Sequence, residues 1–286
     1  MSSQENNSAR PSLLVIQPDS QDPLDRFAGL LTDAGLAIRV IRPFAQETLP
    51  DRLEEDGLLV LGGRMSVVDD GKYSWLADIR RLLCHAVDLP RPALGICLGG
   101  QLLAQTFGGT VTPGDRGLEA GIVRIRWRPE AQADALFANL PMPFLAGAMH
   151  DDMVKTLPEI AVWLGHSDMY PHHAFRVGAY AWGVQFHPEV SLAGYSDWVA
   201  ARGGTDPVAL RRMRRGAADF RRLDDDVIAA SRCLPGGSLI WSAPCPSATT
   251  TDRGRCRGDK AMIGDLADDN PVVRARRADR LGVQLR

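Results

Sequence analysis

Short, continuously apolar segments alternate with amphipathic segments through the first 107 residues, and this alternation limits the folds open to the chain. Strands that are apolar on both faces are typical of a parallel sheet that helices cover on both sides. The sequence therefore predicts an α/β fold with a central, mostly parallel sheet. The expected strands are residues 13–16, 37–41, 57–61 and 92–96, and the expected helices are residues 23–33, 75–87 and 98–107.

The second half of the chain is mixed. Residues 121–127 alternate apolar and polar side chains, as a half-exposed strand does. Asp206 and Pro207 suit the start of a long helix, because Asp caps helices and Pro is tolerated at the first helical position. Further short strands are expected over residues 161–164, 174–177 and 181–186.

Changes in composition suggest where the folded domain begins and ends. Residues 1–10 are polar and are expected to be disordered. After Cys233 the chain becomes charged and rich in Pro, Gly and Thr, so residues 234–286 are expected to form a flexible tail. One domain is therefore predicted over residues 11–233.

Charge and cysteine content exclude several classes of protein. The 286 residues carry a net charge of −2, which gives no general attraction to nucleic acid or to an anionic membrane. No apolar run approaches the ~18 residues of a membrane span, and the N-terminus does not resemble a signal peptide. Five cysteines without a C-x-x-C pair fit neither a disulfide framework nor a zinc site. A cytoplasmic protein is expected.

The segment Gly95-Ile96-Cys97-Leu98-Gly99 lies between an expected strand and an expected helix. A sharp strand-to-helix turn exposes a nucleophile above the sheet, and glycines two positions away on either side remove clashes with its backbone. The helix N-terminus then favours a thiolate and offers the Leu98 N–H to an oxyanion. The same pentapeptide is also compatible with an ordinary buried cysteine in a tight turn.

A cysteine nucleophile needs a base, and His187-Pro188-Glu189 supplies one with an orienting carboxylate. Residues i and i+2 of an extended chain point the same way, so Glu189 can hold the tautomer of His187. Alone, a His-x-Glu sequence is most often a solvated loop. Together with the turn at Cys97, it predicts a Cys–His–Glu triad.

Two long segments resemble the class I, or triad, glutamine amidotransferases: Ala93-Leu-Gly-Ile-Cys-Leu-Gly-Gly-Gln-Leu-Leu-Ala104 and Gly183-Val-Gln-Phe-His-Pro-Glu-Val190. Gly57-Leu-Leu-Val-Leu-Gly-Gly-Arg-Met-Ser66 is similar to the free-standing, GMP-synthase-like members of this family. The resemblance runs from about residue 13 to residue 190. It implies a flavodoxin-like three-layer fold that hydrolyses glutamine to glutamate and ammonia.

The resemblance also implies roles for individual residues. Cys97 would attack the side-chain amide, His187 would shuttle protons and Glu189 would orient His187. The oxyanion would lie against the backbone N–H groups of Gly63 and Leu98. The expected substrate-binding residues are Gly62, Gln101 and His150, the last within a segment that lines the amino-acid end of glutamine in the family.

The resemblance leaves the fate of the ammonia open. No P-loop and no Ser-Gly-Gly-x-Asp-type pyrophosphatase loop occurs in the sequence, so a separate synthetase chain is the expected acceptor. One alternative is a stand-alone hydrolase of γ-glutamyl amides or peptides that uses the same triad. A second alternative is a degenerate, non-catalytic binding module. The expected chemistry needs neither a metal nor an organic cofactor.

A few features depart from the family pattern or remain without a role. Arg64 stands where relatives commonly carry Pro, and segments 118–122 and 168–175 match only in part. These departures affect substrate and acceptor preference rather than the triad. His172 and His173 are interpreted as a loop pair without a third metal ligand. The run 211–215 is interpreted as a solvated helix face, with docking of an acidic partner as the alternative.

Overall fold

The computed structural model describes residues 10–203 and 206–234 of the chain. Apart from Arg10 and Leu234, the expected disordered N-terminus and the expected tail over 234–286 lie outside the described residues. Within the described residues, no helix is long and apolar enough to cross a membrane.

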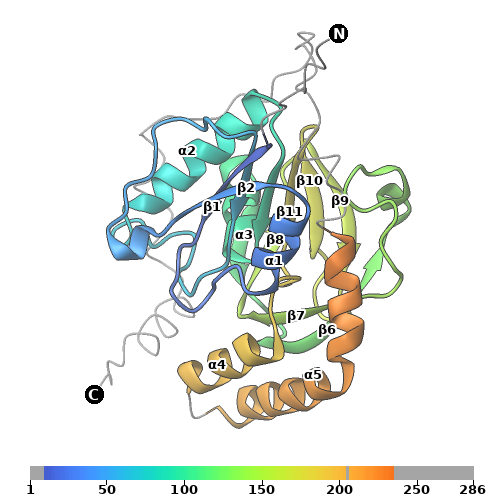
Figure 1. Ribbon diagram of the computed structural model, residues 1–286. Helices are drawn as coiled ribbons and strands as arrows, with labels where there is room; N and C mark the ends of the chain where they lie inside the picture. Colours follow the sequence, from blue (N-terminus) through green and yellow to red (C-terminus); the bar gives the residue numbers. More distant parts are fainter. Residues whose placement is uncertain (1–9, 204–205, 235–286) are drawn as a thin grey trace. The chain divides into compact units, whose positions relative to one another are not determined.

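A nine-stranded sheet lies at the centre of the described part of the chain, in the order β2-β1-β3-β4-β11-β10-β9-β6-β7 (Figure 1). Neighbouring strands run parallel from β2 to β11, as the sequence predicts, and antiparallel from β11 to β7. Strands β5 and β8 form a separate antiparallel pair. The strands are β1 (Ser12–Ile16), β2 (Ala37–Ile41), β3 (Gly57–Val60), β4 (Ala93–Ile96), β5 (Thr110–Pro113), β6 (Glu119–Trp127), β7 (Phe144–His150), β8 (Asp152–Thr156), β9 (Ala161–His166), β10 (Ala174–Val177) and β11 (Ala181–Val184).

Helices cover both faces of the parallel half of the sheet. In β1, Leu13 and Val15 belong to one buried apolar cluster, whereas Leu14 and Ile16 belong to the other, as the two-residue period of a strand requires. The first cluster includes residues of α1, and the second includes residues of α2 and α3. The helices are α1 (Arg26–Asp33), α2 (Trp75–Asp88), α3 (Leu98–Thr106), α4 (Leu192–Arg202) and α5 (Pro207–Cys233), with short 3-10 turns η1 (Pro43–Ala45) and η2 (Pro129–Ala133).

Helices α4 and α5 lie together beside β6 and β7 (Figure 1). Helix α5 begins as the sequence predicts, with the Asp206 side chain accepting a hydrogen bond from the Val208 N–H at 2.8 Å and Pro207 at the first position. Phe220 of α5 packs in a buried cluster with Tyr195 of α4. This cluster anchors α4 beside the segment that follows β11.

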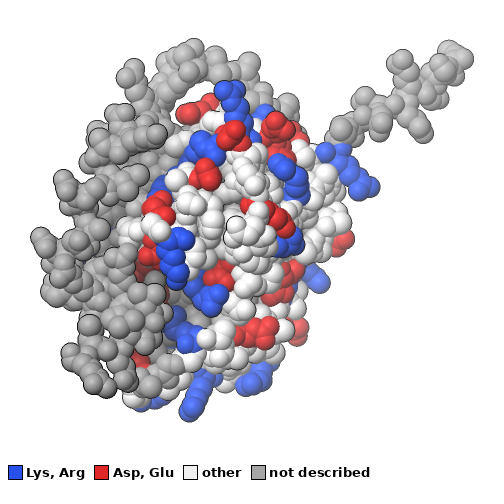
Figure 2. Space-filling view, turned by 90° about the vertical axis from the view of Figure 1, so that its left-hand side faces the viewer, with Lys and Arg blue, Asp and Glu red and all other residues white. Residues whose placement is uncertain are grey.

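Charged side chains of both signs are interspersed over the face of the molecule in Figure 2, in keeping with the net charge of −2. The basic run on α5 follows this mixed pattern. Arg215 is 86% exposed, whereas Arg212 donates hydrogen bonds to the carbonyl groups of Arg116 and Leu118. Residues 211–215 therefore form a solvated helix face only in part, because Arg212 joins α5 to the segment before β6.

Candidate active site

Cys97 occupies a sharp turn between β4 and α3. A Cβ atom on Gly95 would lie 2.4 Å from the carbonyl group of Gly99, and a Cβ on Gly99 would lie 2.3 Å from the carbonyl oxygen of Val60. Real side chains do not approach backbone so closely, so both glycines are required by the turn. The spacing seen in the sequence thus has the steric cause that we predicted for it.

The backbone of Cys97 has a φ of 49°, a left-handed conformation that is uncommon for a residue with a side chain. Cys97 is also the residue before the first turn of α3, where negative charge is favoured by the helix dipole. Its side chain is buried. The left-handed backbone and the helix N-terminus are compatible with the nucleophile that the sequence predicts.

His187 and Glu189 lie just beyond β11, at the carboxyl end of the parallel strands. The Nδ1 atom of His187 lies 2.6 Å from Oε1 of Glu189, and both side chains are buried. Backbone hydrogen bonds between His187 and Gly147 hold the segment beside β7. Burial opposes a charge on the ring, but Glu189 and Cys97 outweigh it and raise the pKa of His187 well above its usual value.

The structure brings Cys97 to the same imidazole. Both Cys97 and Glu189 act on the ring to raise its pKa, and the carboxylate of Glu189 is hydrogen-bonded to it. A second polar group faces the sulfur, because Nε2 of Gln185 lies 3.5 Å from Sγ of Cys97. We did not predict Gln185, which lies in the bend directly after β11, two residues before His187.

The two glycines expected to form the oxyanion region lie at the end of β3. A Cβ atom on Gly63 would lie 3.0 Å from Cδ2 of Leu98, so these two predicted donors belong to neighbouring segments. A Cβ on Gly62 would lie 2.6 Å from Cε1 of His187. Residues Gly62 and Gly63 therefore adjoin both the first turn of α3 and the imidazole.

Gln101 and His150, two expected substrate-binding residues, point into the protein rather than into open space. Nε2 of Gln101 donates to the carbonyl oxygen of Asp152 and to Oε1 of Gln185, each at 3.1 Å. Nδ1 of His150 donates to the same carbonyl of Asp152 at 2.9 Å. Both side chains therefore hold the segment after β7 in place, and neither ring nitrogen of His150 is free for a substrate.

Glu119, His150 and His173 form a buried polar cluster that we did not predict. Nε2 of His150 and Nε2 of His173 lie 3.0 and 2.7 Å from Oε2 of Glu119, within hydrogen-bond distance, and Ser167 donates to Oε1 at 2.7 Å. Burial alone would favour the neutral acid, but the two imidazoles hold the pKa of Glu119 well below its usual value. His173 is therefore not part of a simple loop pair.

The same three residues are a set of donors that could hold a metal, since their ligand atoms all lie within 4.8 Å of one another. The separations of 2.7 and 3.0 Å from the carboxylate are those of hydrogen bonds, which account for the arrangement without an ion. The sequence offered no local indication of this cluster, because the three residues are 23 or more positions apart.

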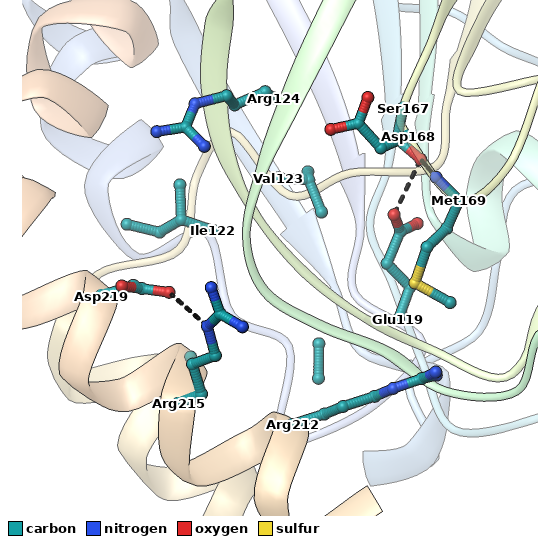
Figure 3. A pocket seen from close by; sticks show the side chains of 12 residues that line it. Glu119, Ile122, Val123, Arg124, Ser167, Asp168, Met169, Arg212, Arg215 and Asp219 are labelled. Carbon is teal, nitrogen blue, oxygen red and sulfur yellow. Dashed lines mark hydrogen bonds and ion pairs between the residues drawn. The ribbon is translucent and has the colours of Figure 1, made fainter. Parts of the chain in front are cut away.

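A hollow of about 260 Å³ lies on the other side of Glu119, between β6 and α5 (Figure 3). In this view Arg124 lies at its upper edge and Arg212 along its lower edge, and Arg215 lies 3.9 Å from Asp219. The hollow is lined by β6, α5 and the turn at Ser167, whereas Cys97 and His187 lie at the ends of β4 and β11. It is thus a separate feature that meets the buried cluster at Glu119.

Comparison with known proteins shows the family to which the chain is similar. Residues 28–200 match the family model of the glutamine amidotransferase class-I domain. The chain is 33% identical over 162 residues to a subunit of the glutamine-hydrolyzing GMP synthase of Archaeoglobus fulgidus, covering 56% of this chain and 79% of that protein. It is 37% identical over 113 residues to the subunit of the same name from Methanococcus maripaludis strain C5, covering 39% of this chain and 58% of the relative. The chain thus spans little more than half the length of some of these relatives.

Solved structures show the same fold. A glutamine amidotransferase of Thermotoga maritima superimposes with a TM-score of 0.71 at 23% identity, covering 82% of this chain and 100% of that one. A glutamine amidotransferase of Methylobacillus flagellatus gives a TM-score of 0.70 at 25% identity, with 82% and 94% of the two chains covered. The predicted α/β fold of the class I amidotransferases is confirmed by these likenesses.

Proposed function

Because the chain belongs to the glutamine amidotransferase class-I family, we propose that it hydrolyses the side-chain amide of L-glutamine to glutamate and ammonia. The observation that carries this proposal is the buried group of Cys97, His187 and Glu189, in which the imidazole is hydrogen-bonded to Glu189 and its pKa is raised by both neighbours. A base held by a carboxylate and facing a thiol is the arrangement that nucleophilic acyl transfer requires.

The thiolate of Cys97 adds to the carbon of the carboxamide and forms a tetrahedral adduct. The oxygen of the adduct takes the negative charge and is stabilised by the backbone N–H groups of Leu98 and Gly63. His187 gives its proton to the nitrogen, the C–N bond breaks and ammonia leaves a glutamyl thioester on Cys97. His187 then removes a proton from water, which attacks the thioester and releases glutamate and the thiol.

Buried polar side chains around Cys97 and His187 hold these two residues in the orientation that the steps require. Glu189 keeps Nδ1 of His187 protonated, so that Nε2 faces the sulfur and the substrate. Gln185 offers an amide N–H to the sulfur. Gln101 holds the carbonyl oxygen of Gln185, so the amide of Gln185 keeps this orientation.

The ammonia is passed to a separate synthetase chain in this proposal. The relatives named as a subunit of GMP synthase support a division of labour between chains. We expect the purified chain to hydrolyse glutamine slowly and to accelerate when the synthetase is added. Fast turnover in isolation, or turnover of γ-glutamyl peptides in preference to glutamine, would instead support the stand-alone hydrolase.

The nucleophile is tested by measuring glutamate and ammonia release by Cys97→Ala and by the unaltered chain. The variant should lose essentially all turnover and keep its melting temperature. A diazo-ketone analogue of glutamine should label Cys97 and spare Cys233, which is exposed and lies at the end of α5. Glutamine turnover by Cys97→Ala at a rate near that of the unaltered chain would exclude the thioester route.

A further inference from the structure

The carboxyl group of Asp22 lies beside the catalytic imidazole and has no part in the mechanism above. Asp22 belongs to the loop between β1 and α1 and is 6% exposed. A Cβ atom on Gly62 would lie 3.1 Å from Oδ1 of Asp22 and 2.6 Å from Cε1 of His187. The carboxyl and the imidazole therefore both adjoin Gly62, at the edge of the expected oxyanion region.

Within the described part of the chain, the carboxyl of Asp22 makes no hydrogen bond or ion pair, whereas both other aspartates of its loop do. Asp19 accepts two hydrogen bonds from the Arg64 guanidinium, at 2.8 and 2.9 Å. Asp25 accepts one from the Ser191 N–H at 2.7 Å. A buried carboxyl without a donor is costly. A donor on a bound ligand would remove this cost.

The loop that carries Asp22 is held against the catalytic segment from two sides. Nε1 of Trp198 donates to the carbonyl of Gln21 at 2.7 Å, and the Trp198 ring packs edge-on against His187 with centroids 4.6 Å apart. The Arg26 N–H donates to the carbonyl oxygen of Glu189 at 3.1 Å. The position of Asp22 relative to His187 is therefore fixed by the fold.

This inference rests on the proposed function. In the tetrahedral adduct, the oxygen faces the N–H groups of Leu98 and Gly63, and the departing nitrogen faces His187. We propose that Asp22 forms the leaving-group subsite, where it accepts an N–H of the departing nitrogen and selects leaving groups by charge. Ammonia or a cationic amine is accepted there, whereas a leaving group that carries a carboxylate is repelled.

The same triad could cleave two classes of substrate, and the proposal predicts which class is preferred. Glutamine releases ammonia, which brings no negative charge to Asp22. A γ-glutamyl amino acid or peptide releases an amino acid or a peptide. The carboxylate of this leaving group would lie close to the buried Asp22. Asp22 thus favours glutamine and γ-glutamyl derivatives of diamines over γ-glutamyl peptides.

The electrostatic surroundings make this selection dependent on pH. Burial raises the pKa of Asp22 to about 7, and Asp19 and Glu189 act in the same direction. His187 and Arg64 oppose them. The carboxyl therefore gains its charge near neutral pH, and selection for cationic leaving groups should increase as the pH rises through about 7.

The test uses three γ-glutamyl amides of similar size, whose leaving groups are ethylamine, ethylenediamine and glycine. For each compound, kcat/KM is measured at pH 8, or its inhibition constant against glutamine where it is not turned over. A charge-assisted hydrogen bond is worth about ten- to a hundredfold. We expect the unaltered chain to prefer the diamine compound over the glycine compound by about this factor.

Asp22→Asn should bring this preference close to one, and the exposed Asp33→Asn on α1, which makes the same change in net charge, should leave it unchanged. Labelling of Cys97 by the diazo-ketone analogue verifies that the Asp22→Asn site is folded. The ratio measured for the unaltered chain at pH 6 and pH 8 tests the same idea without a substitution, and should rise with pH.

Equal preferences in the unaltered chain and in Asp22→Asn would overturn the proposal, as would a ratio that does not change between pH 6 and pH 8. Failure of the proposed function would look different, because the unaltered chain would then neither hydrolyse glutamine nor be labelled at Cys97.

Discussion

Oε1 of Glu189 lies 2.6 Å from Nδ1 of His187, and the two residues are separated in the chain only by Pro188. The chain bends at residues 188 and 189, and this bend leaves the two side chains close enough to hydrogen-bond. The imidazole is therefore oriented by a group carried on its own segment, independently of how the rest of the sheet packs.

Glu189→Gln tests this orienting role. We expect a large fall in kcat with measurable turnover and little change in KM, because Glu189 contacts the base and not the substrate. His187→Ala should be more damaging by about a hundredfold, as in other triads where the orienting acid contributes less than the base. Steady-state glutamine hydrolysis by both variants gives the comparison.

The double variant His187→Ala with Glu189→Gln provides the control. It should be no slower than His187→Ala alone, because a carboxylate has nothing to orient once the imidazole is absent. If the two losses multiply instead, Glu189 acts separately from His187, and its assignment to the triad is wrong.

The parallel half of the fold could be predicted closely from sequence because its signals are local. The expected strand over 37–41 has the same bounds as β2, and the expected helices 75–87 and 98–107 each lie within one residue of α2 and α3. Apolar strands bounded by Gly and Pro leave few other interpretations. The contact between His187 and Glu189 could be predicted for the same reason, since the two residues belong to one short continuous motif.

Elements with weak local patterns were missed. Strand β7 has the sequence Phe-Leu-Ala-Gly-Ala-Met-His, whose small residues hide the alternation of a strand. Helix α4 buries only Tyr195 and Trp198, too few for a helical pattern to be evident. Both elements are stabilised by α5, which joins them from much later in the chain. Their structure depends on tertiary packing, which outweighs local preference.

The contacts that Glu119, His150, His173 and Asp22 make were missed because only tertiary structure brings these residues together. Glu119 and His150 face each other through the register of β6 and β7, and His173 approaches from the segment before β10. Asp22 reaches His187 from the loop after β1. None of these pairs has a spacing that a sequence pattern could identify.

Glu119→Gln tests whether the buried cluster stabilises the fold. The carboxylate is the shared acceptor of two buried imidazoles, and removing one partner from a buried charged group costs about 3–5 kcal/mol. The free energy of unfolding in urea should fall by about this amount. Glu159→Gln, an exposed position, should leave it unchanged.

The effect of Glu119 should depend on pH in a defined direction. The folded-state pKa of Glu119 is lowered from the ordinary 4.5, so its stabilisation is present above that pH and is lost as the pH falls below it. The difference in unfolding free energy between the unaltered chain and Glu119→Gln should therefore shrink as the pH falls below 4.5. A difference that does not change as the pH falls below 4.5 would contradict an ionised Glu119 in the folded protein.

Gly95→Ala and Gly29→Ala form a matched pair of substitutions. A Cβ on Gly95 would strike the backbone of Gly99 at 2.4 Å, so this variant should lose about 3 kcal/mol and most glutamine turnover. Gly29 is exposed on α1 with nothing within 4 Å of a Cβ, so alanine there should stabilise the protein by up to about 1 kcal/mol. Thermal unfolding should show opposite shifts, and a neutral Gly95→Ala would contradict the tight turn at Cys97.

Gln185→Leu tests the hydrogen bond to the nucleophile. The orientation of the Gln185 amide follows from its neighbours, because the Asp152 carbonyl can only accept and so fixes Nε2 of Gln101 toward Oε1 of Gln185. This leaves Nε2 of Gln185 facing the Cys97 sulfur at 3.5 Å. A hydrogen bond to a charged group contributes about 1.5–3 kcal/mol, so kcat/KM for glutamine should fall by about ten- to a hundredfold.

Alkylation of Cys97 by iodoacetamide at pH 7 separates an effect on the sulfur from an effect on substrate binding. Gln185→Leu should slow alkylation in the absence of glutamine, because the thiolate loses a donor before any substrate is present. Gln105→Leu on the same helix as Gln101 is the control, since Oε1 of Gln105 is buried without a hydrogen-bond partner in the described part of the chain. Equal alkylation rates in the Gln185→Leu variant and the unaltered chain would show that the amide positions glutamine instead of stabilising the thiolate.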